Sequence, residues 1–94
     1  MTRHTLLLRF GAGTPAVERD GVLQSLIGLC DRVGEVASVA CGPNVDPRAR
    51  DGFTHAFRVV FGSEEARDAF RALPGYALAL ERLSQGAEAV QVAD

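Results

Sequence analysis

Four segments of the chain alternate between apolar and polar residues, and one face of each is more apolar than the other. A period of two residues is typical of β-strands. We expect these strands at residues 3–10, 36–41, 53–61 and 89–92.

Between the strands, apolar residues recur at the spacing of an α-helix. Thr14 is expected to cap a helix that has Pro15 at its first position and runs to about Val33. A second helix should begin after Ser63, whose side chain can cap it, and should end at Pro74-Gly75. Residues 76–83 are expected to form a short further helix.

The resulting order, βαββα(α)β, predicts one α+β domain over residues 1–94, a ferredoxin-like βαββαβ plait with the helices on one face of a four-stranded sheet. We place the first and third strands as parallel neighbours at the centre of this sheet. His4 and His55 occupy equivalent points near the starts of those strands, so we expect the two imidazoles to be neighbours at one end of the sheet.

The more apolar faces of the two central strands should receive the helices, and the second helix should pack over the histidine pair. This arrangement predicts a ligand pocket between sheet and helices. Its expected lining is His4, Leu6, Leu8, His55, Phe57, Phe70 and Tyr76. Because an unperturbed histidine titrates near pH 6.5, two imidazoles and a phenol are candidate catalytic groups for proton transfer, namely His55, His4 and Tyr76.

A structural interpretation of the same residues competes with this one. A buried strand histidine commonly satisfies a hydrogen bond to a backbone group or a tyrosine hydroxyl. On that interpretation His55 orients Tyr76 or fixes the preceding loop, and His4, close to the terminus, is partly exposed.

The other faces of the central strands are too apolar for solvent and too charged for a dry core. A second copy packing sheet against sheet would cover them, which predicts a homodimer. The expected interface residues are Leu7, Arg9, Arg58 and Val60.

The formal net charge is -2, and all ten basic residues are arginines scattered along the chain, so a nucleic-acid partner is not expected. No apolar run is long enough for a signal peptide or a membrane span, which favours a cytoplasmic protein. Cys30 and Cys41 are then expected to be reduced. The cysteines and histidines lack zinc-ligand spacing, and we predict no metal or cofactor; Asp46 and Asp51 in the polar loop are the remote alternative.

Two sequence blocks resemble the central signature of the stress-responsive A/B barrel (Dabb) family: Gly42-Pro43-Asn44-Val45 and Gly52-Phe53-Thr54-His55-Ala56. The resemblance extends over nearly the whole chain and implies a dimeric α+β barrel. Some Dabb proteins are similar to plant polyketide cyclases, which use a tyrosine on the second helix and a histidine just after it. The matching positions here are Phe70 and Tyr76, so the cyclase reaction is not expected to be retained.

The leading functional hypothesis is therefore a homodimer that binds a small apolar or aromatic ligand between sheet and helices, without an assigned reaction. The alternative is an enzyme related to polyketide cyclases, with His55 or His4 as base and Tyr76 orienting the substrate. A third class, a purely structural interaction module, would require a filled cavity.

Overall fold

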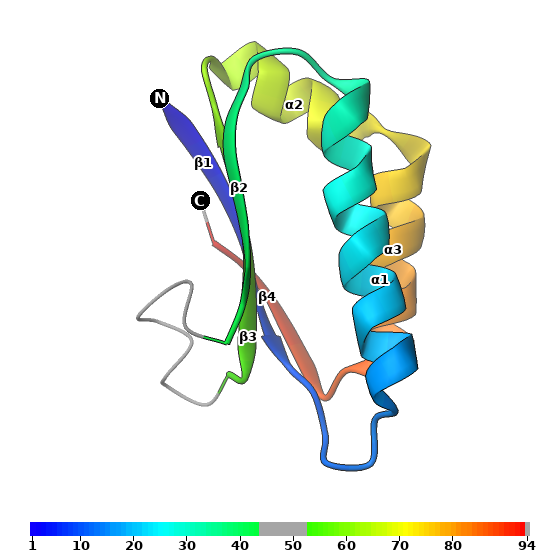
Figure 1. The fold of residues 1–94 in the computed structure, drawn as a ribbon. Coiled ribbons are helices and arrows are strands. Elements are labelled where there is room, and N and C mark those ends of the chain that lie inside the picture. The colour runs from blue at the N-terminus through cyan, green and yellow to red at the C-terminus, as the bar shows by residue number, and fades with distance from the viewer. Residues whose placement is uncertain (44–52, 94) are drawn as a thin grey trace.

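The computed structural model describes residues 1–43 and 53–93. Its elements follow the expected order, with a short 3-10 turn, η1, after the first helix (Figure 1). They are β1 (Thr2–Arg9), α1 (Ala16–Leu29), η1 (Cys30–Arg32), β2 (Val36–Gly42), β3 (His55–Phe61), α2 (Glu64–Ala72), α3 (Pro74–Gly86) and β4 (Ala89–Ala93). This is the predicted ferredoxin-like α+β fold.

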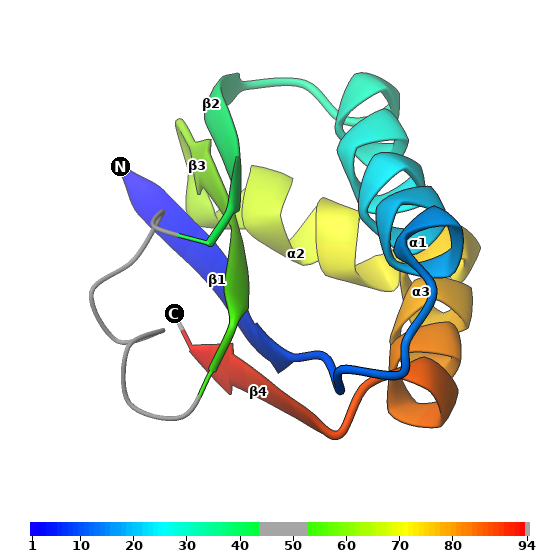
Figure 2. The same ribbon diagram turned by 60° about the horizontal axis from the view of Figure 1, so that its bottom comes forward.

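The four strands lie in the order β2-β3-β1-β4, and each pairs with its neighbours in the antiparallel sense. All three helices cover the same face of this sheet (Figures 1 and 2). The expectation that β1 and β3 run parallel is wrong. The α1 crossover returns the chain so that β2 runs parallel to β1 without touching it, and β3 then turns back between them, antiparallel to both.

The antiparallel register also separates the two histidines. His4 lies opposite Val59, whereas His55 lies opposite Leu8, four residues further along β1. Since a strand rises about 3.3 Å per residue, the two backbone positions are about 13 Å apart along the sheet. His4 and His55 are therefore not neighbours, contrary to the sequence-based expectation.

The helix-facing side of the central strands forms the main core, with Leu6, Leu8, Phe57, Val59 and Phe61 all inaccessible to solvent. Of the two helix caps expected from the sequence, only the second forms. The Ser63 hydroxyl accepts from the Ala66 amide at 3.2 Å, as predicted. Thr14 instead donates to the Gly86 carbonyl at 3.3 Å, and α1 begins one residue after Pro15 without a side-chain cap.

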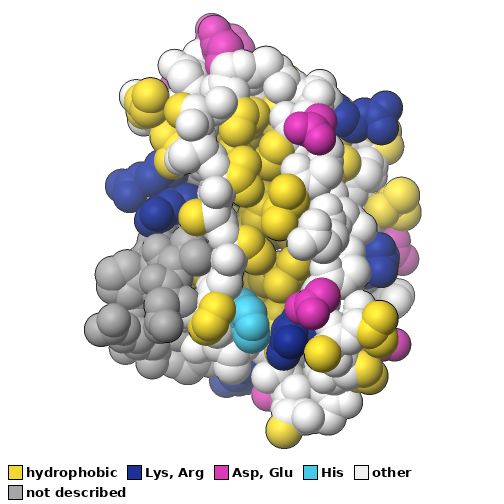
Figure 3. All heavy atoms as spheres, viewed as in Figure 1, with side chains coloured by type: hydrophobic (Ala, Val, Ile, Leu, Met, Phe, Trp, Pro, Cys, Tyr) yellow, Lys and Arg dark blue, Asp and Glu magenta, His cyan; other side chains and the backbone are white. Residues whose placement is uncertain are grey.

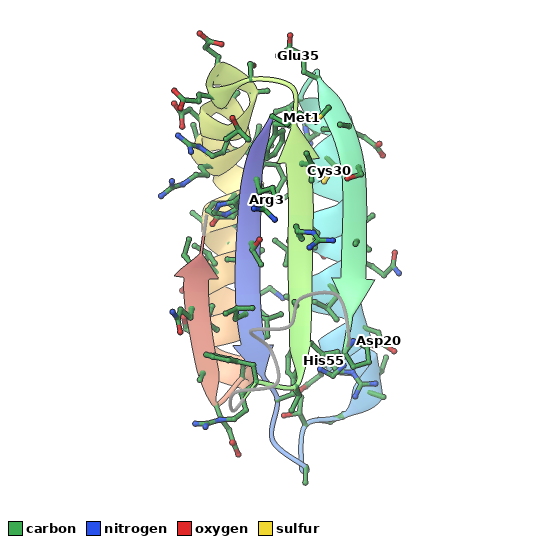
Figure 4. All side chains as sticks on the ribbon, turned by 90° about the vertical axis from the view of Figure 1, so that its left-hand side faces the viewer. Met1, Arg3, Asp20, Cys30, Glu35 and His55 are labelled. Carbon is green, nitrogen blue, oxygen red and sulfur yellow. The ribbon has the colours of Figure 1, made fainter. Side chains whose placement is uncertain are left out.

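Among the residues that the structure describes, no helix covers the opposite face of the sheet, which faces the viewer in Figure 4. The expectation that this face is uncovered holds only in part. Leu7 and Ala56 are buried within the single chain, where the partly buried Phe53 packs against them. Thr5 is also buried, and its Oγ1 has no hydrogen-bond partner among the residues that the structure describes.

Within the described ranges 1–43 and 53–93, no helix is both long enough and apolar enough to cross a membrane.

Candidate functional site

His4 and Tyr76 form a buried polar pair between the sheet and α3. His4 Nε2 lies 2.6 Å from the Tyr76 hydroxyl, and the two side chains are 0% and 5% exposed. Although His4 lies close to the terminus, it is fully enclosed, and the interpretation that it is partly exposed is wrong. Tyr76 is oriented by His4 and not by His55.

Phe70 closes this pair from α2. Its ring centroid lies 6.1 Å from that of His4, with the planes at 62°, and 5.4 Å from that of Tyr76. Phe70 is itself fully buried and also contacts the ring of Phe61. The three side chains thus form one closed aromatic layer in the core, where a hydrogen bond between imidazole and phenol satisfies two buried polar groups.

The predicted seven-residue pocket is therefore divided. Six of its members belong to the closed core and line neither of two pockets that the described residues form; they are His4, Leu6, Leu8, Phe57, Phe70 and Tyr76. His55 lies apart from His4, Phe70 and Tyr76, opposite Leu8 at the other end of β1.

His55 borders a pocket of about 320 Å³ between α1 and the edge of the sheet. The other lining residues are Asp20, Leu23, Gln24, Ile27, Cys41, Gly42 and Pro43. Figure 3 shows a strip of apolar side chains accessible between β2 and α1, with a histidine at its lower end. The strip is open because β2 is an edge strand; Val39, on its helix-facing side, is still 37% exposed.

The His55 ring is held from two sides. Its Nδ1 lies 2.9 Å from Thr54 Oγ1, and the ring makes a T-shaped contact with Phe10 at a centroid distance of 5.2 Å and an interplanar angle of 82°. Thr54 is fixed in turn, because its amide donates to the Leu8 carbonyl at 2.8 Å and its Oγ1 accepts from the Phe10 amide at 3.0 Å. The start of β3 therefore presents the imidazole in a defined orientation beside α1.

Two charged residues of α1, Arg19 and Asp20, influence the pKa of this imidazole. Partial burial lowers the pKa of His55, Arg19 lowers it further, and Asp20 opposes them. Figure 4 shows His55 at the start of β3, and Asp20 lines the same pocket. Arg19 and Asp20 also pair with each other at 3.2 Å. Burial, with a contribution from Asp20, raises the pKa of the Cys41 thiol. At neutral pH the pocket thus offers a neutral imidazole and a neutral thiol.

The α1 side of this pocket was not predicted from the sequence. Asp20 and Gln24 lie one helical turn apart, with Leu23 and Ile27 on the same side of α1. That polar and apolar mixture beside an edge strand was the available signal, but it is indistinguishable in sequence from an ordinary helix boundary.

A second pocket, of about 300 Å³, lies between the N-terminal half of α1 and the end of α3. It is more highly charged, with Glu18, Arg19 and Arg82 in its lining, and Phe10 forms part of its wall. Neither of the two sequence blocks that resemble the family signature contributes a residue to this second pocket.

The residues that the structure describes contain no group of three or more histidine, cysteine, aspartate or glutamate side chains placed to hold a metal ion. The remote metal candidates Asp46 and Asp51 lie outside the described residues.

Comparison with known proteins gives the family of this fold. The family model described as the Stress Responsive A/B Barrel Domain matches residues 2–94. A search of curated protein sequences found no match.

Solved structures resemble the chain over almost its whole length. The Arabidopsis thaliana protein At3g17210 is 22% identical with a TM-score of 0.78, and the match covers 98% of this chain and 90% of that one. A dimeric ferredoxin-like protein of unknown function from Jannaschia sp. CCS1 has the same identity and score, with 98% and 94% covered. A hydroxynitrile lyase from Passiflora edulis is 21% identical with a TM-score of 0.76, with 97% and 87% covered. At these identities the likeness shows the fold.

Proposed function

The chain belongs to the stress-responsive A/B barrel (Dabb) family, and we propose that it is a homodimer that binds a small apolar or aromatic ligand in the pocket between α1 and the sheet at His55. The observation that carries the ligand proposal is the pocket itself. It is concave, about 320 Å³, largely apolar, and bordered by one oriented imidazole. Few polar groups in an apolar cleft are typical of small-molecule sites, which span about 300–1,000 Å³, so the ligand is small.

The proposed ligand site differs from the site expected from the sequence. The His4–Tyr76 pair is enclosed in the core, whereas the His55 pocket is open between β2 and α1. A ligand can reach His55 without displacing Phe70 or Tyr76. The ligand proposal therefore depends on His55, and the His4–Tyr76 pair is assigned a structural role in the core.

The test is a titration with acetophenone, a compact aromatic probe, followed by amide chemical shifts. We expect perturbations at β2, α1 and the start of β3, and at least severalfold weaker binding by His55→Ala. Gln85→Ala, in the lining of the second pocket, serves as the control and should bind as the wild type does. Unchanged affinity in His55→Ala, or perturbations centred on the second pocket, would place the ligand elsewhere.

An enzymatic role is the second candidate. One structural neighbour is a hydroxynitrile lyase, and a neutral imidazole borders the pocket at neutral pH, because burial lowers the pKa of His55. Because Tyr76 bonds to His4 in the core, it does not orient a substrate at His55. Release of benzaldehyde from mandelonitrile, faster than in His55→Ala, would support this role; equal rates in both proteins count against it.

The homodimer proposal depends on the uncovered sheet face. Arg58 and Val60 are partly exposed there, and Arg58 lies opposite the buried Thr5, whose hydroxyl lacks a partner among the described residues. Several structural neighbours are described as dimeric. Of the other two predicted interface residues, Leu7 lies under Phe53 and Arg9 lies 3.4 Å from Glu88 at the sheet end, so Arg58 and Val60 are the better probes.

Sedimentation should give about 20 kDa, twice the chain mass of 10.0 kDa. Val60→Asp places a carboxylate on the sheet face and should shift the protein towards monomer. Leu78→Asp is the matched control, because Leu78 is 60% exposed on α3, on the helical side of the molecule. A monomeric wild type at micromolar concentration, or equal effects of the two changes, would contradict a sheet-to-sheet dimer.

A further inference from the structure

We propose that Thr54 fixes the neutral His55 ring with its proton on Nε2, so that the pocket presents a hydrogen-bond donor and selects neutral ligands that carry a carbonyl oxygen. This inference rests on the proposed ligand pocket and specifies the chemistry that it recognises. It depends on where one hydroxyl proton lies.

Thr54 Oγ1 has a single proton and two acceptors near it. Nδ1 of His55 lies 2.9 Å away, whereas the Leu8 carbonyl oxygen lies 3.4 Å away. Hydroxyl hydrogen bonds to oxygen normally span about 2.5–3.0 Å, so the contact with Leu8 is too long to compete. The Leu8 carbonyl also already accepts the Thr54 amide at 2.8 Å. The hydroxyl proton therefore points to Nδ1.

The Phe10 amide strengthens this assignment. It donates to Thr54 Oγ1 at 3.0 Å, which occupies one of the oxygen's lone pairs. A chain of donors then runs from the Phe10 amide through the Thr54 hydroxyl to Nδ1, each bond polarising the next. In a neutral imidazole one nitrogen accepts and the other donates. With Nδ1 as the acceptor, Nε2 carries the proton.

Nε2 is the nitrogen at the outer edge of the ring, away from the Thr54 hydroxyl that Nδ1 contacts. Among the described residues it makes no hydrogen bond, and His55 borders the pocket. A bound ligand is therefore offered an N–H donor. An acceptor oxygen on the ligand satisfies it, whereas a purely apolar ligand would bury it unpaired, which is unfavourable.

The rest of the lining favours a neutral acceptor over a carboxylate. Asp20 brings a negative charge to the pocket, and its partner Arg19 lies at 3.2 Å. An anionic ligand would face that carboxylate, while a ketone or aldehyde oxygen carries no net charge. Leu23, Ile27 and Pro43 supply the apolar contacts for the ligand body. The structure thus assigns the site to compact carbonyl compounds.

The first test reads the tautomer without any ligand. Two-bond ¹H–¹⁵N spectra separate protonated from unprotonated ring nitrogens, and we expect His55 protonated on Nε2 at pH 7.5. Thr54→Ser keeps the hydroxyl and should keep this tautomer. Thr54→Val keeps the shape without the proton and should shift the population towards a mixture. A wild-type ring protonated on Nδ1, or a Thr54→Val spectrum identical to the wild type, would overturn the inference.

The second test uses two probes of nearly equal shape. Acetophenone carries a carbonyl, and α-methylstyrene carries a CH₂ group in its place. We expect the wild type and Thr54→Ser to bind acetophenone about five- to tenfold more tightly than α-methylstyrene, as one net hydrogen bond provides, and Thr54→Val to lose most of that preference. Benzoate should bind more weakly than acetophenone.

The outcomes separate this inference from the proposed function. Equal binding of acetophenone and α-methylstyrene at the His55 pocket would support a ligand site and overturn its carbonyl preference. Tighter binding of benzoate would overturn the preference for neutral ligands. Binding of none of the probes would count against the proposed function, and the ligand-free spectra would still decide the role of Thr54.

Discussion

Removing the Tyr76 hydroxyl tests whether the His4–Tyr76 pair is a structural element of the core. In Tyr76→Phe, His4 Nε2 loses a partner at 2.6 Å in a position that is 0% exposed. Loss of one partner of a buried hydrogen bond costs about 1–3 kcal/mol. For a domain of this size, 1 kcal/mol lowers Tm by roughly 4–8 °C, so a loss of about 2 kcal/mol corresponds to roughly 8–16 °C. Urea and thermal unfolding at one protein concentration measure both quantities.

Two further variants make this experiment decisive. Ser84 lies on the same helix as Tyr76, and its hydroxyl donates to the Leu80 carbonyl at the surface. Ser84→Ala should therefore change stability by less than about 0.5 kcal/mol. His4→Leu combined with Tyr76→Phe removes both polar partners, so it should be less destabilised than the sum of the single changes. A Tyr76→Phe protein as stable as Ser84→Ala, or strict additivity in the double variant, would refute the structural role.

Three further predictions concern packing, protonation and access to the pocket. Gly28→Ala should stabilise α1 by about 0.5–1 kcal/mol, because a Cβ there meets nothing within 4 Å. Gly75→Ala should stabilise less, because its Cβ would lie 2.6 Å from Leu29 Cδ2 and that side chain would have to shift; urea unfolding that ranks the two variants in the opposite order would contradict the packing. The pKa of His55 is lowered in the folded state, by burial first and by the neighbouring arginine second, so protonation favours the unfolded chain. Stability should therefore fall as the pH drops below about 6.5, the unfolded value, and the fall should be smaller in His55→Gln. Bound acetophenone should slow the alkylation of Cys41, which lines the pocket, as mass spectrometry after timed iodoacetamide exposure would show; an unchanged rate would argue against occupancy there.

The sequence predicted the elements of the fold because each has a local cause. Alternation of side chains identified the strands to within two residues, and Ser63 marked the start of α2 through the hydrogen bond that it makes. The one-sided helical cover also follows from the more apolar strand faces. At Thr14 the local signal failed. Thr14 precedes Pro15 as a capping residue should, but its hydroxyl donates to the distant Gly86 carbonyl.

The candidate site was harder to predict because its members meet through long-range pairing. The alternation placed His4 and His55 on the helix-facing side of their strands, as the register confirms. Relative strand direction is set by the crossover and not by either strand's own pattern, and one incorrect direction moved His55 to the wrong end of the sheet. The same error joined a closed core and an open pocket into a single predicted cavity.

Separating the two histidines gives each a distinct physical role. His4 sits where Phe70 and Tyr76 exclude solvent, and its hydrogen bond holds the sheet to α3. His55 sits at the open edge, where Thr54 and Phe10 fix its orientation but leave its outer nitrogen without a partner among the described residues. A side chain whose inner hydrogen bond is satisfied and whose outer one is left for another molecule is oriented for recognition. The asymmetry between these two imidazoles, one enclosed and one presented, is therefore the strongest argument for the proposed ligand site between β2 and α1.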